Sequence, residues 1–176
     1  AFSTPTRAAD ADRWLFTRQT FTEFPNLRVS GAAFRDSKQI TDANPQQSEY
    51  VWGRRVLIDY RDRDGHRLQG LVALPDDYQD GERRPMIVHL YEKNSQNLNR
   101  YNAPSYLTGM GGSPMQAVTE GYLTMLPDIH FNTGSSHSDQ LDAVEAATRK
   151  VIEMGYADPK RIGLNGHSYG GEGAAF

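Results

Sequence analysis

The sequence contains no cysteine, and that absence excludes three kinds of chemistry at once. A disulfide-rich scaffold, a thiolate metal site and a cysteine nucleophile all require the residue. The sequence also lacks any stretch near the roughly 20 apolar residues that a membrane-spanning helix needs. Its mean hydropathy is −0.67, so we expect a soluble protein without a membrane span, in a compartment that the cysteine count does not fix.

An excess of charge of one sign is missing as well. Lys and Arg number 19, Asp and Glu number 22, and the formal net charge is −3. A basic surface of the kind that binds nucleic acid or an anionic membrane is therefore not expected. The chain opens with Ala1 in place of Met, which predicts that the natural N-terminus lies upstream. The lack of an apolar signal core in the first residues therefore does not decide between a cytoplasmic and a secreted or periplasmic protein.

What the sequence does contain begins with a region of short strands, residues 1–48. Its β-prone runs occupy 13–18, 20–24, 26–30 and 39–41, and turn residues separate them. Short strands of this kind without a helical period predict a small antiparallel sheet. Such a sheet buries little apolar surface by itself, so we expect the region to pack against further chain.

Residues 49–176 show a different order, in which strands alternate with helices. A hairpin followed by strand, helix, strand, helix and strand is predicted at 56–60, 68–74, 85–91, 114–120, 122–126, 136–155 and 161–165. This alternation is typical of an α/β fold with a mainly parallel sheet covered by helices. In the long helix, helical spacing predicts a buried face made of Leu141, Val144, Thr148, Val151 and Ile152.

The sequence Gly166-His-Ser168-Tyr169-Gly170 follows the last predicted strand and precedes a possible helix. A strand, a sharp turn and a helix around G-x-S-x-G are the setting of a nucleophile elbow, which presents the serine hydroxyl at the carboxyl edge of a sheet. In that setting Ser168 is the candidate nucleophile, and the backbone N–H of Tyr169 points to where an oxyanion forms. The alternative is a glycine-rich turn that opens a helix in an ordinary α/β protein.

Several motifs in the same order resemble the catalytic domain of the prolyl oligopeptidase family of serine peptidases. The resemblance covers about residues 50–176. Its motifs are Tyr50-Val-Trp-Gly53, Leu68-Gln-Gly70, Pro85-Met-Ile-Val-His-Leu-Tyr91, Gly121-Tyr-Leu123, Pro127-Asp128, Gly155-Tyr-Ala-Asp-Pro-Lys-Arg-Ile162 and Asn165-Gly-His-Ser-Tyr-Gly-Gly171.

The resemblance implies a fold, an activity and one more site residue. Residues 1–48 would be the last strands of a β-propeller, and 49–176 the first half of an α/β-hydrolase domain that stops after the elbow. The expected activity is hydrolysis of short peptides through an acyl-enzyme on Ser168, with no cofactor and no metal. Tyr91 matches the family's tyrosine whose hydroxyl donates to the oxyanion, although a strand-end aromatic that packs at a sheet edge is the simpler reading of it.

The chain departs from the family pattern at three places near the site. Glu92-Lys93 follow Tyr91 where two glycines are common, and Glu172 stands where many relatives have an aromatic residue. Where many members have Asp-x-Arg-Gly, this chain has Asp128-Ile-His130. We therefore expect Asp128 to organise a loop rather than to act as an acid.

A serine nucleophile needs a histidine base and an acid that orients it. In this fold both follow the serine in the chain, but only eight residues follow Ser168, and none is Asp or His. The triad Asp and His are thus absent from this chain, and the fragment alone is expected to be inactive.

The histidines of the chain do not replace the missing base. His89 is expected in the core and His66 in an exposed hairpin turn, while His167 points away from its neighbour. His130 and His137 lie at the correct sheet edge, where we expect neither a base nor a metal site. Two other functions stay open, an esterase or acyltransferase of the same fold and a non-catalytic interaction domain.

Overall fold

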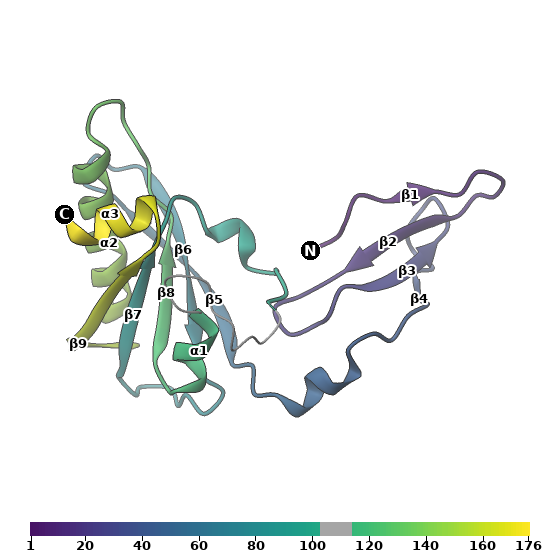
Figure 1. The fold of residues 1–176 in the computed structure, drawn as a ribbon, viewed down its shortest axis with the longest axis horizontal. Helices are drawn as coiled ribbons and strands as arrows, with labels where there is room; N and C mark the ends of the chain where they lie inside the picture. Colours follow the sequence, from purple (N-terminus) through teal and green to yellow (C-terminus); the bar gives the residue numbers. More distant parts are fainter. Residues whose placement is uncertain (103–113) are drawn as a thin grey trace. The chain divides into compact units, whose positions relative to one another are not determined.

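A computed structural model describes residues 1–102 and 114–176. The chain forms two compact units, one made of 1–51 with 99–103 and the other of 52–98 with 104–176. The helix and strand labels below are those of Figure 1.

The first unit is an antiparallel sheet with the strand order β1-β2-β3-β4. The strands and the 3₁₀ helix that follows them are β1 (Thr6–Arg7), β2 (Trp14–Arg18), β3 (Asn26–Ser30), β4 (Lys38–Gln39) and η1 (Pro45–Glu49). All three pairings between neighbours are antiparallel, which confirms the small antiparallel sheet predicted for this region.

The strand predicted at 20–24 is wrong. This segment is the connection between β2 and β3, whose ladder begins at the pair Arg18 and Asn26. The Arg18 guanidinium donates to the Glu23 carboxylate at 3.0 Å and closes the connection. An alternating pattern marks a strand only where a neighbour pairs with it, and here the chain must reverse direction instead.

The second unit is a mixed sheet with the strand order β5-β6-β8-β7-β9. The strands are β5 (Arg54–Arg61), β6 (Arg67–Leu74), β7 (Arg84–Leu90), β8 (Leu123–Pro127) and β9 (Ala157–Gly166). The pairings β5–β6 and β6–β8 are antiparallel, whereas β8–β7 and β7–β9 are parallel. The sheet is therefore mixed rather than mainly parallel, because the opening hairpin contributes two strands to it.

Helices and a 3₁₀ turn join the strands of the second unit. They are η2 (Ser95–Asn97), α1 (Pro114–Thr119), α2 (Ser136–Glu153) and α3 (Tyr169–Ala175). The long helix α2 packs along the sheet and contacts strands as far apart in it as β5 and β9, and α3 follows β9 (Figure 1). Among the described helices, none has the length and apolar character that a membrane crossing requires.

The buried face of α2 differs from the predicted one by about one residue. Gln140, Ala143, Ala147 and Val151 are buried, whereas Leu141 is 60% exposed. The two alanines let the helix backbone approach the sheet closely, so the stripe centred on them faces inward. Val144 and Ile152, also predicted for this face, pack at its margin.

The hydrophobic core of the second unit lies between α2 and the sheet. Leu123 and Met125 of β8 are fully buried, as are Met86 of β7 and Leu74 of β6. This core fixes β7, β8 and β9 side by side. It thereby places the carboxyl ends of three strands at one edge, which is where α/β folds carry their sites.

Candidate active site

Ser168 lies at the junction between β9 and α3, with a backbone of φ 55° and ψ −123°. A positive φ is costly for a residue with a Cβ, by about 1–3 kcal/mol, and persists only where the surroundings impose it. The side chain is exposed. Strand, turn and helix thus follow one another as the sequence predicts, and the serine stands at the sharpest point of the turn.

Two glycines make this turn possible by close backbone contact. A Cβ on Gly166 would lie 2.0 Å from the carbonyl oxygen of Gly170. A Cβ on Gly170 would lie 2.1 Å from the carbonyl oxygen of Leu90, the last residue of β7. Neither backbone oxygen can move aside without moving its strand or helix. Because neither glycine carries a Cβ, the backbone at the start of α3 can lie in direct contact with the end of β7. Ser168 lies between the two glycines in the sequence.

The first amides of α3 fall next to the serine. The N–H groups of Gly171 and Glu172 donate to the Ser168 carbonyl at 2.9 and 3.1 Å. The N–H of Tyr169 belongs to the first helical residue, for which a helix offers no internal acceptor. The aromatic ring of Tyr169 packs against that of Phe131, with 5.6 Å between the ring centroids. A free amide beside a nucleophile is the usual donor to an oxyanion.

Tyr91 is the first residue after β7, and its side chain is 44% exposed. The preceding residue, Leu90, pairs in register with Gly166, two residues before Ser168. The structure thus brings Tyr91 and the elbow to the same sheet edge from segments that are far apart in the sequence. The sheet register places Tyr91 near the serine, while its role as an oxyanion donor stays a prediction.

Asp128, directly after β8, holds the loop that follows Tyr91. Its side chain is buried and accepts hydrogen bonds from the backbone N–H groups of Asn94 and Ser95, at 2.6 and 2.8 Å. These contacts confirm that Asp128 organises the loop, while the expectation that it is not a catalytic acid stays a prediction. Its backbone carbonyl accepts a hydrogen bond from the Tyr60 hydroxyl. Burial, and then the Asp128 charge, raise the pKa of Tyr60, which keeps that phenol a donor.

Four of the five histidines are engaged with groups other than Ser168. His66 Nδ1 lies 2.8 Å from the Asp62 carboxylate, and the His130 ring packs on the His66 ring at 4.3 Å between centroids. His89 is hydrogen-bonded to the side chain of Asn165, and burial lowers the pKa of His89. His89 is half-buried and lies outside the buried core, so its expected hydrogen-bonded character is confirmed and its expected place in the core is not.

His137 makes the fourth of these contacts. Its Nε2 lies 2.8 Å from a carboxylate oxygen of Glu172, and its ring stacks on Phe176 with 4.8 Å between centroids. The pair joins the start of α2 to α3. Sequence reasoning noted both residues separately and missed the contact, since 35 positions separate them and no local pattern links them.

No cluster of three or more His, Asp or Glu side chains with the geometry of a metal site occurs in residues 1–102 and 114–176. Within these described residues, no such cluster lies beside Ser168.

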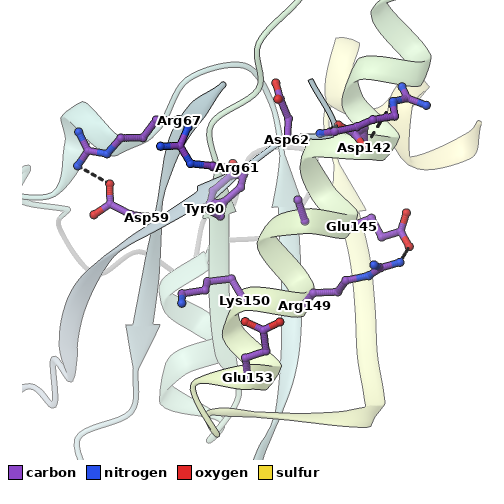
Figure 2. Close-up of a pocket in the computed structure, with 12 residues that line it drawn as sticks. Asp59, Tyr60, Arg61, Asp62, Arg67, Asp142, Glu145, Arg149, Lys150 and Glu153 are labelled. Carbon is purple, nitrogen blue, oxygen red and sulfur yellow. Dashed lines mark hydrogen bonds and ion pairs between the residues drawn. The ribbon is translucent and has the colours of Figure 1, made fainter. Parts of the chain in front are cut away.

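A charged pocket of about 750 Å³ lies elsewhere in the second unit, between the β5–β6 hairpin and α2. Figure 2 shows both acidic and basic side chains around the pocket. Asp59 forms an ion pair with Arg67 at 2.6 Å. Glu145 and Arg149 of α2 form another of its ion pairs. Its lining includes neither Ser168, Tyr169 nor Tyr91. The pocket is thus separate from the elbow, and its balanced charges favour no ligand of one sign.

Comparisons with known proteins agree with the motifs. No family model matches the chain. It is 26% identical over 148 residues to a probable glutamyl endopeptidase, chloroplastic, from Oryza sativa subsp. japonica, covering 75% of this chain and 16% of that protein. It is 23% identical, over an alignment of 189 residues, to dipeptidyl peptidase family member 6 from Caenorhabditis elegans, covering 92% of this chain and 25% of that one.

Solved structures show the same fold. AtxE2 isopeptidase matches with a TM-score of 0.71 and 20% identity, over 94% of this chain and 27% of the other. Porphyromonas gingivalis dipeptidyl peptidase 4 matches with a TM-score of 0.69 and 17% identity, over 97% and 26%. The chain spans only 16% and 25% of the length of the two curated relatives.

The mixed sheet and the strained serine between β9 and α3 define the class, an α/β fold that carries a nucleophile elbow. Its ordered motifs resemble those of the prolyl oligopeptidase family, and the chain is similar in sequence to the two curated peptidases and in fold to the solved ones.

Proposed function

We propose that this chain is the nucleophile-bearing part of a serine peptidase, and that Ser168 is the nucleophile. The observation that carries the proposal is the backbone of Ser168, with φ 55° and ψ −123°, held by the contacts of Gly166 and Gly170. A fold does not maintain a strained serine at a strand–helix turn without compensation elsewhere. A functional advantage that accounts for the strain is the presentation of the Ser168 hydroxyl at the edge of the sheet.

We further propose the domain assignment that the resemblance implies. Residues 1–48 are the last strands of a β-propeller, and 49–176 are the first half of an α/β-hydrolase domain. The antiparallel sheet of the first unit and the strand order β5-β6-β8-β7-β9 of the second support the assignment. The relatives are several times longer than this chain, which leaves room for the rest of both domains.

The mechanism follows from acyl transfer at Ser168. Its Oγ attacks the carbonyl carbon of the scissile peptide bond while its proton passes to a general base, and the carbonyl oxygen becomes an oxyanion. The Tyr169 N–H and the Tyr91 hydroxyl donate to that oxyanion. Collapse expels the amine, which takes a proton from the base, and leaves an ester on Ser168. Water, deprotonated by the same base, then hydrolyses the ester.

The base and its acid come from chain outside these 176 residues in this proposal. Four histidines have the other partners described above, and no Asp or His follows Ser168 in the sequence. Loss of a triad base can reduce turnover by about 10⁶. The 176-residue piece by itself is therefore expected to be inactive.

Short peptides are the proposed substrates, and no cofactor takes part. The proteins that this chain resembles are named as a probable glutamyl endopeptidase, a dipeptidyl peptidase family member and an isopeptidase, and these names support a peptidase. The nucleophile elbow itself does not specify amides, because esterases and acyltransferases use the same device. An esterase or acyltransferase is thus the second candidate.

A comparison of two substrates separates these candidates. The full-length protein that carries this sequence would be assayed with peptidyl arylamides and with a short-chain p-nitrophenyl ester, and Ser168→Ala would be the control. The proposal expects arylamide hydrolysis that Ser168→Ala abolishes. Hydrolysis of the ester alone would favour an esterase. No hydrolysis of either substrate, combined with no covalent labelling of Ser168, would favour a non-catalytic interaction domain.

A further inference from the structure

We propose that Asp128 is a positioning residue, which aims the Tyr91 hydroxyl at the oxyanion by fixing the loop from Tyr91 to Asn97. The inference rests on the proposed function, since it assigns Asp128 a part in the same reaction. Asp128 does not touch the substrate in this account. It acts through the backbone of the loop that begins with Tyr91.

In a helix or a strand, backbone carbonyl groups would accept hydrogen bonds from the amides of this loop. Here the carboxylate of Asp128 accepts them instead. One oxygen accepts from the N–H groups of Asn94 and Ser95 at 2.6 and 2.8 Å, and the other accepts from the Ser95 hydroxyl. The Asp128 residue is only 6% exposed. Buried amides without an acceptor are costly, so the loop follows the carboxylate wherever the carboxylate is held.

The backbone around Asp128 is tied down on both sides. The Asp128 N–H donates to the Gln69 carbonyl of β6 at 2.8 Å, and the Asp128 carbonyl accepts from the Tyr60 hydroxyl of β5. Both partners belong to the opening hairpin, which is part of the sheet core. The carboxylate is therefore a fixed point rather than a mobile surface group.

The loop is tied to the same strand end at two further points. The Ile129 N–H donates to the Glu92 carbonyl at 2.9 Å, and the Asn94 side chain donates to the Pro127 carbonyl at 3.2 Å. Tyr91 therefore sits between two anchors. Leu90 before it is held in the β7–β9 ladder, and Glu92 after it is held to Ile129.

These anchors matter because Tyr91 is 44% exposed, so that fewer packing contacts hold it than hold a core residue. A phenol hydroxyl lies far from its own backbone, so a rotation of roughly 10° at Tyr91 displaces the hydroxyl by about 1 Å. A misplacement of that size can reduce a rate by about 100-fold. A carboxylate that holds the loop thus controls how well the hydroxyl reaches an oxyanion.

A purely structural role for Asp128 predicts a different result from a positioning role, and a double-mutant cycle distinguishes the two. The full-length protein would be compared with Tyr91→Phe, Asp128→Ala and the double variant. The readout is the second-order rate of Ser168 labelling by a fluorophosphonate, whose phosphoryl oxygen occupies the oxyanion site. The labelling rate does not depend on knowing the natural substrate. Cooperative thermal unfolding would verify that each variant is folded.

We expect Tyr91→Phe to slow labelling by about 100-fold, as loss of one oxyanion donor does. Asp128→Ala should slow it by about tenfold or more, and the double variant should be within about threefold of Tyr91→Phe, because a missing hydroxyl cannot be misplaced. Asp128→Asn keeps an oxygen for the two amides and should restore most of the rate. Independent losses, which multiply to about 1,000-fold in the double variant, would overturn the inference.

Asp128→Ala leaves one buried and one partly buried amide without an acceptor and can fail to fold. Ser95→Ala then takes its place in the cycle, since it removes one bond to the carboxylate and leaves the core untouched. We expect a loss of about threefold that disappears in the Tyr91→Phe background. A loss of the same size in both backgrounds, or no loss in either, would refute positioning.

Asp36 gives a matched control in the first unit. Its carboxylate accepts from the Gly31 N–H at 2.9 Å and from the Ser30 hydroxyl at 2.8 Å, the same two kinds of donor. Asp36→Ala should lower stability without changing the labelling rate. A normal rate for Tyr91→Phe would overturn this inference while Ser168 remains the nucleophile. Absence of labelling in the unmutated protein would overturn both.

Discussion

The conformation of Ser168 predicts that Ser168→Gly gives a more stable protein than Ser168→Ala. With φ 55° the residue occupies a region that favours glycine. Ser168→Gly and Ser168→Ala both remove the hydroxyl, so neither can form an acyl-enzyme. They differ only in whether a Cβ remains in the strained backbone.

The size of the difference follows from two opposing contributions. Relief of the strained φ contributes about 2 kcal/mol, within the usual range of about 1–3 kcal/mol. The greater freedom of glycine in the unfolded chain costs about 0.5–1 kcal/mol. Ser168→Gly should therefore be more stable than Ser168→Ala by about 1 kcal/mol.

Urea unfolding of the two variants measures this difference directly. Ser138 provides the matched control, because it is an exposed serine with helical backbone in the first turn of α2. There the order should reverse, with Ser138→Gly less stable than Ser138→Ala by about 1 kcal/mol. If glycine is the less stable substitution at Ser168 as well, the backbone of the elbow is not strained and the reasoning fails.

Further predictions concern the packing and the titration of the second unit. Gly170→Ala should destabilise the fold by about 3 kcal/mol in urea unfolding and slow fluorophosphonate labelling, because its Cβ would lie 2.1 Å from the Leu90 carbonyl oxygen. Met125→Ala empties a fully buried position and should cost about 2–5 kcal/mol in the same assay. Because burial lowers the pKa of His89 below its unfolded value of about 6.5, the neutral side chain's contribution to stability should be fully present above that pH and should be lost as the pH falls below it and through the lower pKa of the folded state. His89→Gln should flatten the profile of unfolding free energy measured from about pH 8 to pH 5, and an unchanged slope would contradict the assignment.

Strand positions were predictable from the sequence wherever hydrophobic pattern and turn residues agreed. The hairpin and the strands at 85–91, 122–126 and 161–165 were found because buried strands require apolar runs bounded by breakers. The mixed character of the sheet was not predictable, because the hydrophobic pattern of a strand does not reveal which neighbour the strand pairs with. The α2 face was misplaced for a related reason, since Ala143 and Ala147 carry little hydrophobic signal although they allow close packing.

The elbow was predictable from the sequence because a Cβ at either of its two glycines would clash with nearby backbone. Gly166 and Gly170 are required by contacts within a few residues or with the adjacent strand. The contacts of Asp128 with Asn94 and of His137 with Glu172 were not foreseen, since each joins segments more than 30 positions apart. Side-chain partners of this kind depend on the completed fold.

The most direct test of the account is to locate the covalent adduct that a fluorophosphonate forms with the full-length protein. Peptide mapping by mass spectrometry should find one adduct, on Ser168, and Ser168→Ala should remove it. An adduct on another serine, or none on a folded protein, would show that the strained turn does not present a nucleophile.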